Sequence, residues 1–426
     1  MKKRFFALLF FLCTAYLLPL ASGLIWGKSA FILLSLVFLT ALFLIWRKRE
    51  LLNKNSSTRN YFFLVTLLCI SISAIDLSIN IYRNWQAEQE SLFASTDLPL
   101  LQKYKPLQER DIHYSDAPSN NPNAREQILH IKTDALGFRN NAHTKKNCDA
   151  LLIGDSFGVG MCTQDSTISE LLYSNLHYNS YNLSVSGNGP WEQFHLLQRE
   201  LKNISLKKGA PVLWLLFAGN DLEGNYGPLR NTDELYTVAK KTERARDSFF
   251  AFREKSPLRC ALESLAHSED KQALLLRKKI NKNQEITFYS NYAKEFENYG
   301  CCNCEIETHK NYKALKATLR ATMQLMREKN IALKIYLLPS KEEVYQWLLY
   351  GKKEWTSDTC ASPLSKLLSS VATENAVDFH DSKPFIIRES KKHFESERAL
   401  LYWHYDTHLN ARGNLLIAQY IAATLK

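Results

Sequence analysis

The sequence predicts an α/β fold in which helices cover both faces of a parallel sheet, preceded by N-terminal transmembrane helices. Two observations lead to this prediction. After residue 126, short apolar runs typical of strands buried on both faces alternate with segments of helical periodicity. Before residue 83, long apolar stretches carry almost no charge, as membrane spans require. We therefore interpret the chain as a membrane anchor followed by one large globular domain.

Residues 1–82 form the predicted anchor, with three transmembrane helices. The stretch Phe5–Trp46 contains a single charge, at Lys28, and is long enough for two passes of about 20 residues with a turn near that lysine. Tyr61–Tyr82 is the third predicted span. Its one charge, Asp76, lies in the later half, where a carboxylate can reach the interface.

Basic residues next to the spans predict the orientation of the anchor. The positive-inside rule places both basic groups in the cytoplasm, and three passes then leave everything after residue 82 on the periplasmic or extracellular side of a bacterial inner membrane. A cleaved signal peptide, with Phe5–Pro19 as its apolar region and cleavage near Ala21–Gly23, is the alternative. The basic residues are Lys2, Lys3, Arg4, Arg47, Lys48, Arg49, Lys54 and Arg59.

The net charge and the cysteines limit the expected partners. The charge of +11 comes partly from the cytoplasmic groups, and the remainder predicts a solvated basic surface or an anionic envelope partner. No nucleic-acid motif is present, so we expect no nucleic acid. Nine cysteines suit an oxidising compartment. Cys148 and Cys162 flank the first motif below and are candidates for a disulfide, as are Cys260, Cys360 and the cluster 301–304. That cluster lacks a second ligand pair for zinc, so we expect no metal and no cofactor.

The region after the anchor divides into a linker and a domain. Residues 83–125 are polar and contain four prolines, typical of a juxtamembrane linker. Residues 126–426 form the domain, with a charged, cysteine-bearing insertion at about 224–305 that shows no strand alternation. The expected strands are Ala150–Ile153, Tyr181–Val185, Val212–Phe217, Ile331–Leu338 and Ala376–Phe379. The expected helices are Thr167–Leu176, Gln193–Leu201, a methionine-bearing helix from Tyr312 that stops at Asn330, and Asn414–Leu425.

Three segments far apart in the chain carry the chemistry. Gly154–Gly158 supplies a serine, Ala218–Asp221 supplies an amide side chain, and Tyr405–Asn410 supplies an aspartate–histidine pair. Together these groups are able to attack an ester carbonyl and bind the resulting oxyanion. The first two segments directly follow predicted strands. Because the carboxyl ends of parallel strands meet at one edge of the sheet, we expect the segments to converge there.

Each group has an expected role. Ser156 is the expected nucleophile, His408 the general base, and Asp406 the acid that fixes the imidazole tautomer. The backbone N–H groups of Ser156 and Gly187 and the side-chain amide of Asn220 are the expected oxyanion donors. An ordinary turn serine, a loop aspartate and a capping histidine remain the alternatives.

Several neighbouring residues receive weaker assignments. His404 is a less favoured base, and Asn188 and Asp221 are expected to be structural supports. Gly154–Gly158 also fits the G-x-S-x-G elbow of α/β-hydrolases. We reject that assignment because Ser156 follows the first core strand and because the acid and the base lie only two residues apart.

Four ordered blocks of the domain resemble the SGNH hydrolase superfamily, the GDSL-like esterases and lipases. The resemblance implies a flavodoxin-like three-layer αβα sandwich. It also implies a triad of Ser156, Asp406 and His408, with Gly187 and Asn220 as oxyanion donors. The blocks are Gly154–Ser156, Asn182–Gly187, Gly219–Asp221, and Asp406 with His408.

The acid–histidine spacing departs from the commoner family pattern. The chain has D-x-H where D-x-x-H is usual, and Tyr405, at the usual acid position, cannot serve as an acid. The short spacing, followed by Leu409, Asn410 and Gly413, resembles a membrane-linked branch whose members acetylate or deacetylate bacterial polysaccharides.

These observations predict a membrane-anchored serine esterase that acts through an acyl-enzyme on acyl esters, O-acetyl esters above all, of envelope glycans or lipids. The expected partners are that acylated carbohydrate or lipid and the membrane. An O-acyltransferase on an envelope polysaccharide would use the same intermediate. A non-catalytic envelope assembly protein that retains the fold is the third alternative, because fold alone does not establish function.

Overall fold

The structure is a computed structural model of the 426-residue chain. It describes residues 93–94, 103–115, 126–141, 147–223, 275–281, 284–300, 303–351 and 360–425. The chain divides into two units, and all of these residues belong to the unit formed by Leu92–Asp233 and Gln272–Lys426. Within this described part, no helix combines the length and the apolar character needed to cross a bilayer. The spans predicted in residues 1–82 lie outside it.

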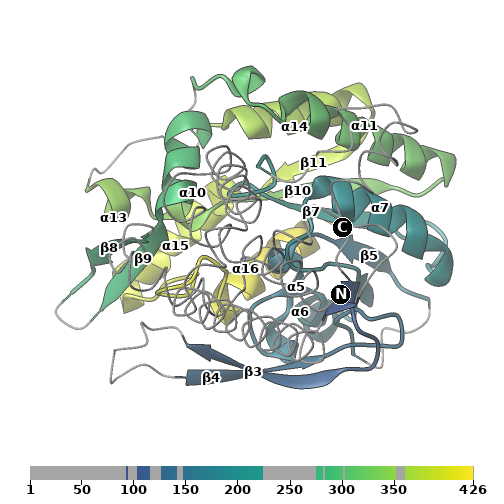
Figure 1. The fold of residues 1–426 in the computed structure, drawn as a ribbon, viewed down its shortest axis with the longest axis horizontal. Coiled ribbons are helices and arrows are strands. Elements are labelled where there is room, and N and C mark those ends of the chain that lie inside the picture. The colour runs from purple at the N-terminus through teal and green to yellow at the C-terminus, as the bar shows by residue number, and fades with distance from the viewer. Residues whose placement is uncertain are drawn as a thin grey trace, which may run out of the picture. The chain divides into compact units, whose positions relative to one another are not determined.

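A five-stranded parallel sheet forms the centre of this unit, and each of its strands overlaps a predicted strand, although three of them have different bounds (Figure 1). Numbered along the chain within the sheet, the strands lie in the order 2-1-3-4-5, a doubly wound arrangement also found in flavodoxin. From one edge to the other they are β6 (Ser180–Asn182), β5 (Ala150–Ile153), β7 (Val212–Phe217), β10 (Leu333–Leu338) and β11 (Asp378–Asp381).

Position in the sheet explains the composition of the strands. Every residue of β5 and of β7 is buried, which accounts for their unbroken apolar sequence. β11 lies at an edge and is polar and partly exposed. It begins two residues later than expected because Ala376 has a φ of +53°, and this left-handed residue ends the preceding helical turn.

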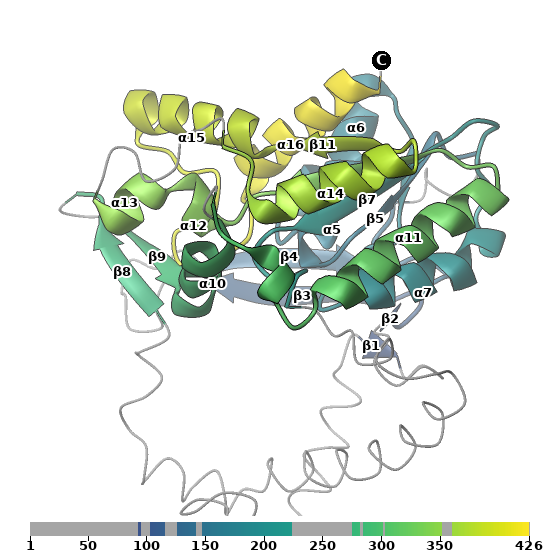
Figure 2. The same cartoon turned by 90° about the horizontal axis from the view of Figure 1, so that it is seen from above.

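Helices cover both faces of the sheet, so the unit is a three-layer α/β sandwich (Figure 2). Alternate residues of β7 enter the two cores, with Leu216 on one face and Leu215 on the other. The first face is covered by α7 (Pro190–Glu200), α11 (Tyr312–Glu328) and α14 (Pro363–Glu374). The second face is covered by α6 (Ile168–Leu176), α15 (Lys383–Glu397) and α16 (Ala411–Thr424).

The methionine-bearing stripe of α11 is part of the core, as predicted. Leu315, Leu319, Met323 and Met326 recur at helical spacing and are buried against the sheet. Asn330 has a φ of +54°, so it stops the helix as expected.

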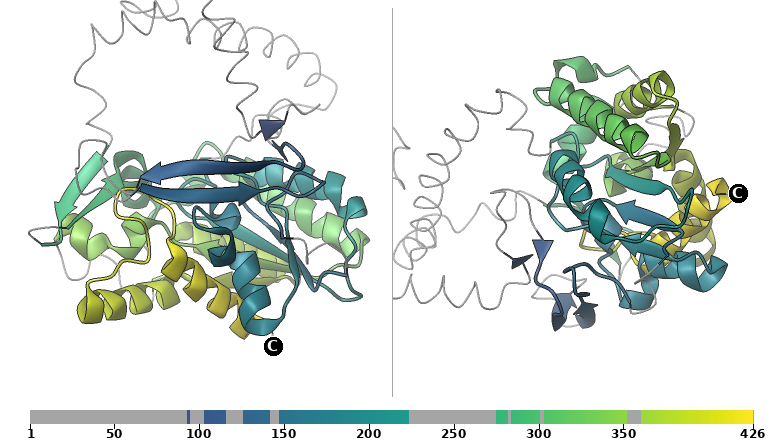
Figure 3. Two further views of the ribbon diagram at one scale, coloured as in Figure 1. Left: turned by 90° about the horizontal axis from the view of Figure 1, so that it is seen from below. Right: turned by 90° about the vertical axis from the view of Figure 1, so that its right-hand side faces the viewer.

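Three antiparallel strand pairs of the described residues lie outside the central sheet, and two of them have longer strands. β3 (Glu109–Ser115) pairs with β4 (Glu126–Lys132), so part of the predicted linker is a strand (Figure 3). β8 (Leu275–Lys279) pairs with β9 (Glu285–Tyr289) inside the predicted insertion, where we expected no strands. Each of these two strands has only five residues. β8 is largely basic and does not alternate, whereas β9 alternates polar and apolar residues from Glu285 to Phe288, and we overlooked that signal.

The remaining elements are short. The strands among them are β1 (Phe93–Ala94), which pairs with β2 (Lys103–Tyr104), and the α-helices among them are α5 (Ser156–Val159), α10 (Ser290–Glu295), α12 (Lys341–Val344) and α13 (Gln346–Tyr350). A Ser340–Glu343 capping box begins α12 directly after β10.

Leu319→Ala is expected to lower the free energy of unfolding by about 2–5 kcal/mol, because this side chain is fully buried between α11 and the sheet. Urea unfolding of the purified chain, followed by circular dichroism, measures the change. Lys313→Ala, on the exposed side of the same helix, is the control and should stay within about 0.5 kcal/mol of the wild type. Identical unfolding curves for Leu319→Ala and the wild type would contradict this packing.

Candidate active site

The carboxyl ends of β5 and β7 bring the predicted site together. Ser156 follows β5, and Asn220 lies in the turn after β7. The two strands are neighbours, and the strand order reverses at this point because β6 lies on the outer side of β5. Connections that leave such a pair of strands run to opposite faces of the sheet and open a crevice between them.

Local packing fixes the turn that carries Ser156. Ser156 is the first residue of α5, and Asp155 caps this helix by accepting the N–H of Phe157 on Oδ1 at 2.8 Å. Glycine is required at position 158, because a Cβ there would lie 2.2 Å from Oγ of Ser184. Ser156 itself remains partly exposed.

The structure brings Ser156, His408 and Asp406 into one chain of hydrogen bonds. Nε2 of His408 lies 2.8 Å from Oγ of Ser156, although the two residues are 252 positions apart. Nδ1 of His408 lies 2.5 Å from Oδ1 of Asp406, which also accepts the backbone N–H of His408 at 2.8 Å. Because a carboxylate accepts from Nδ1–H, Nε2 is left with its lone pair towards the serine hydroxyl.

A tight loop holds the acid and the base. Tyr402 and Leu409 form an antiparallel bridge, and the N–H of Trp403 donates to the carbonyl of His408 at 3.0 Å. The side chain of Asn410 then closes the loop. Its Nδ2 donates to the carbonyl of Leu400, just before the loop, at 2.8 Å and to that of Tyr402 at 3.1 Å, while its Oδ1 caps α16. We call residues 402–409 the acid–base loop.

The predicted oxyanion donors follow three neighbouring strands of the sheet: Ser156 follows β5, Gly187 follows β6 and Asn220 follows β7. Gly187 has a φ of +82°, a left-handed conformation that turns the backbone after β6. No hydrogen bond within the described residues uses the N–H of Ser156 or of Gly187. The side chain of Asn220 approaches Asp155, beside the nucleophile.

Two buried carboxyl groups, those of Asp155 and Asp221, lie next to the candidate site in the sequence. Burial raises the pKa of Asp155. Hydrogen bonds from the backbone N–H of Phe157 and the side chain of Asn220, and the charge of His408, act in the opposite direction and lower this pKa. Oδ2 of Asp221 accepts the N–H of Phe217 at 2.6 Å. Burial and the neighbouring Asp155 raise the pKa of Asp221 well above its usual range. The arrangement is consistent with the predicted supporting role of Asp221 and favours its neutral form.

Aromatic side chains that the sequence analysis did not predict lie beside the imidazole of His408. The ring of Phe157 lies 4.9 Å from that of His408 and stacks on Phe217 at 3.7 Å. Phe217 in turn contacts Tyr292 of α10 edge-on at 6.0 Å. Burial, together with Asp155, raises the pKa of Tyr292 to about 12, so its hydroxyl stays neutral. Tyr292 belongs to the predicted insertion, where no motif marked it.

His404 hydrogen-bonds to β9. Its Nδ1 donates to the carbonyl of Glu285 at 2.9 Å, and its own carbonyl accepts the N–H of Thr287 at 2.8 Å. His404 therefore joins the acid–base loop to β9, and His408 is the histidine that meets Ser156.

The predicted disulfide between Cys148 and Cys162 is wrong. Both are buried and neither belongs to a disulfide, because Cys148 precedes β5 and Cys162 comes after it. Burial raises the pKa of the Cys162 thiol to about 11. Cys304 and Cys360, which were also candidates for pairing, are disulfide-bonded.

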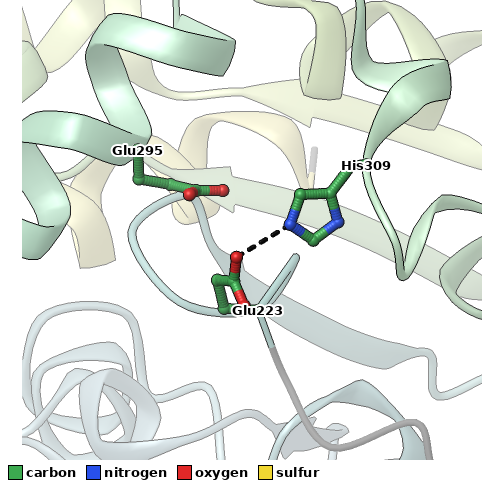
Figure 4. Close-up of side chains that lie close together, drawn as sticks. All are labelled: Glu223, Glu295 and His309. Atoms are coloured by element: carbon green, nitrogen blue, oxygen red, sulfur yellow. Dashed lines mark hydrogen bonds and ion pairs between the residues drawn. The ribbon is translucent and has the colours of Figure 1, made fainter.

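A second cluster of ionisable groups contains Glu223, which lies three residues after Asn220, together with Glu295 and His309 (Figure 4). Ligand atoms of Glu223, Glu295 and His309 lie within 4.8 Å of one another. Nε2 of His309 bonds Glu223 at 2.9 Å, and its Nδ1 accepts the N–H of Asn311 at 3.1 Å. In the neutral ring Nε2 therefore carries the proton, so no lone pair faces the cluster for a metal ion. Burial raises the pKa of Glu295 to about 7. The geometry favours a hydrogen-bonded pair beside a carboxylic acid.

Comparison with known proteins adds little to this description. No family model matches the chain, and no curated protein matches it. Among solved structures it is similar to an acetyl xylan esterase, AlAXEase, at 13% identity and a TM-score of 0.35, over 65% of this chain and 100% of that one. So distant a likeness carries no conclusion about activity, and the α/β sandwich is established by the sheet and its helices.

Cys148 and Cys162 are expected to be unreactive towards a thiol reagent such as DTNB in the folded chain, because both side chains are buried. In denaturant, the wild type should release two more equivalents of product than a Cys148→Ser, Cys162→Ser double variant. Without denaturant the two proteins should give equal values. Equal values in denaturant would show that these cysteines are already oxidised.

Proposed function

We propose that the chain is a serine esterase that forms an acyl-enzyme on Ser156, as its resemblance to the SGNH hydrolases implies. The observation that carries the proposal is the continuous contact from Oγ of Ser156 to Nε2 of His408 at 2.8 Å, and from Nδ1 to Asp406 at 2.5 Å. Serine hydroxyl is a weak nucleophile until a base removes its proton, and this arrangement supplies the base in the required tautomer.

The proposed reaction moves one proton back and forth across Nε2. As Oγ of Ser156 bonds to the ester carbonyl carbon, its proton passes to Nε2 of His408, and Asp406 stabilises the imidazolium. The tetrahedral intermediate collapses when the carbon–oxygen bond to the alcohol breaks and that oxygen takes the proton from Nε2. A water molecule then repeats the attack on the acyl-enzyme and releases the acid.

The negative charge that develops on the carbonyl oxygen is assigned to three donors. The N–H groups of Ser156 and Gly187 make no other hydrogen bond within the described residues. The amide of Asn220 has two N–H donors, so one remains for substrate when the other faces Asp155. Donors fixed by the sheet need little reorganisation as the charge forms, which is the basis of oxyanion stabilisation.

The substrate class and the location come from the sequence. The predicted spans and the short acid–histidine spacing support O-acetyl esters of envelope glycans or lipids as substrates, on the outer side of a bacterial cytoplasmic membrane. That spacing equally favours a second function, transfer of the acyl group to a sugar hydroxyl, because only the acceptor of the acyl-enzyme differs. Turnover of an acetyl ester with and without an oligosaccharide acceptor separates the two.

Ser156→Ala is expected to abolish labelling by a fluorophosphonate and turnover of an activated acetyl ester, because the variant lacks the nucleophile. The matched control is Ser174→Ala, on the exposed side of α6, which should label and turn over like the wild type. A folded wild-type chain that neither labels nor turns over ester would refute the esterase and favour the assembly-protein alternative.

Asn220→Ala is expected to lower kcat by ~10²–10³-fold with little change in KM, the usual cost of losing one oxyanion donor. Steady-state kinetics on the same acetyl ester measure both constants. The outcome against the assignment is a rise in KM at unchanged kcat, since that would make Asn220 a ground-state binding residue.

A further inference from the structure

Two buried cations lie behind the candidate active site, and the first holds the acid–base loop. Lys341 begins α12 at the carboxyl end of β10 and is 0% exposed. Its Nζ donates to the backbone carbonyls of Trp403, His404 and Asp406 at 2.6, 2.9 and 3.0 Å. An ammonium group has three N–H donors, so one side chain directs all of them at the segment that leads to His408.

The stem of this loop has separate anchors. The hydroxyl of Tyr402 donates to the carbonyl of Pro339 at 2.6 Å, and the hydroxyl of Tyr345 accepts the N–H of Leu401 at 2.8 Å. These contacts fix where the loop leaves the core. Lys341 acts further along, at the carbonyl of Asp406 itself. Loss of Lys341 therefore leaves the stem in place and frees the part that carries the acid.

The second cation holds the turn that follows the nucleophile. Arg139 is also 0% exposed, and its guanidinium reaches the far end of α5. Nε donates to Gln164 at 2.8 Å, Nη2 to the carbonyl of Cys162 at 2.7 Å, and Nη1 to the carbonyls of Val159, at 3.3 Å, and Gly160. Carbonyls at the end of a one-turn helix lack helical partners, and the planar guanidinium supplies them with donors.

We propose that Lys341 and Arg139 are positioning residues for the serine reaction: Lys341 sets the acid–base loop and Arg139 sets the turn of Ser156, so that Nε2 and Oγ meet. The inference rests on the proposed function. Neither cation touches the reacting atoms. A buried charge persists only when hydrogen bonds compensate its lost hydration, and here backbone carbonyls of the two active-site segments provide that compensation. Removal of either cation therefore disturbs one segment and spares the other.

The first test is hydrogen exchange on the full chain, which needs no activity. Lys341→Met should speed backbone amide exchange in peptides covering 402–409 and leave 157–163 unchanged. Arg139→Met should give the reverse pattern. Lys383→Met is the matched control, because Lys383 is a second buried lysine, 3.9 Å from Glu343, and is not bonded to either segment. It should leave both peptides unchanged.

The second test is the rate of modification by a small fluorophosphonate, measured as a function of reagent concentration. Lys341→Met and Arg139→Met should each lower the maximal rate constant by ~10²-fold, the typical effect of a misplacement of about 1 Å, at an unchanged half-saturating concentration. Lys383→Met should react like the wild type. A purely structural role would lower the amount of reactive protein without changing the rate constant of the folded fraction.

The outcomes separate the two proposals. A wild type that never reacts would refute the esterase, and the exchange pattern would still decide whether each cation holds its segment. A reactive wild type with Lys341→Met and Arg139→Met variants that react and exchange like it would overturn the positioning role alone. If Lys341→Met does not fold, Lys341→Gln replaces it, since it keeps two of the donors. Failure of both to fold would make Lys341 a folding residue and would also overturn the proposal.

Discussion

The reversal of strand order between β5 and β7 is the constraint on which the candidate site depends. All five strands of the sheet are parallel, so every segment that follows a strand emerges at one edge. At the reversal, the connections diverge and leave room for a substrate. Ser156 follows β5 and Asn220 follows β7 at this reversal, and α16 packs against α6. The acid–base loop directly precedes α16, so the same packing delivers His408.

Much of this arrangement could be predicted from the sequence, because its signals are local. Unbroken apolar runs marked the core strands, and helical spacing marked α11. Strand ends followed by Ser156 and Asn220 placed both residues at one edge of the sheet. The contact between Ser156 and His408 needed more than pattern, and the prediction relied there on the order of the motifs. The membrane spans remain predictions, because they fall outside the described residues.

The remainder could not be predicted because it depends on the path of the backbone in three dimensions. Lys341 follows a strand in the sequence, yet its acceptors are backbone carbonyls of a loop some 60 residues later. Every residue has a backbone carbonyl, so the sequence does not show which ones will accept these bonds. Arg139 is similar. The Cys148–Cys162 prediction failed because closeness in sequence does not show that β5 lies between the two thiols. Polar residues of this kind in a core require hydrogen bonds, and the fold supplies those bonds from the active-site segments.

The D-x-H spacing has a mechanical consequence. A single oxygen of Asp406 bonds both the backbone N–H and the ring of His408, so the base and its counter-ion form one rigid unit. A shift of that unit by roughly an ångström or two would break its contact with the hydroxyl of Ser156, while the bond to Asp406 would keep the imidazole in the same tautomer. Such a site could therefore be inactivated and reactivated by moving the Asp406–His408 pair relative to Ser156, without breaking the bonds within the pair.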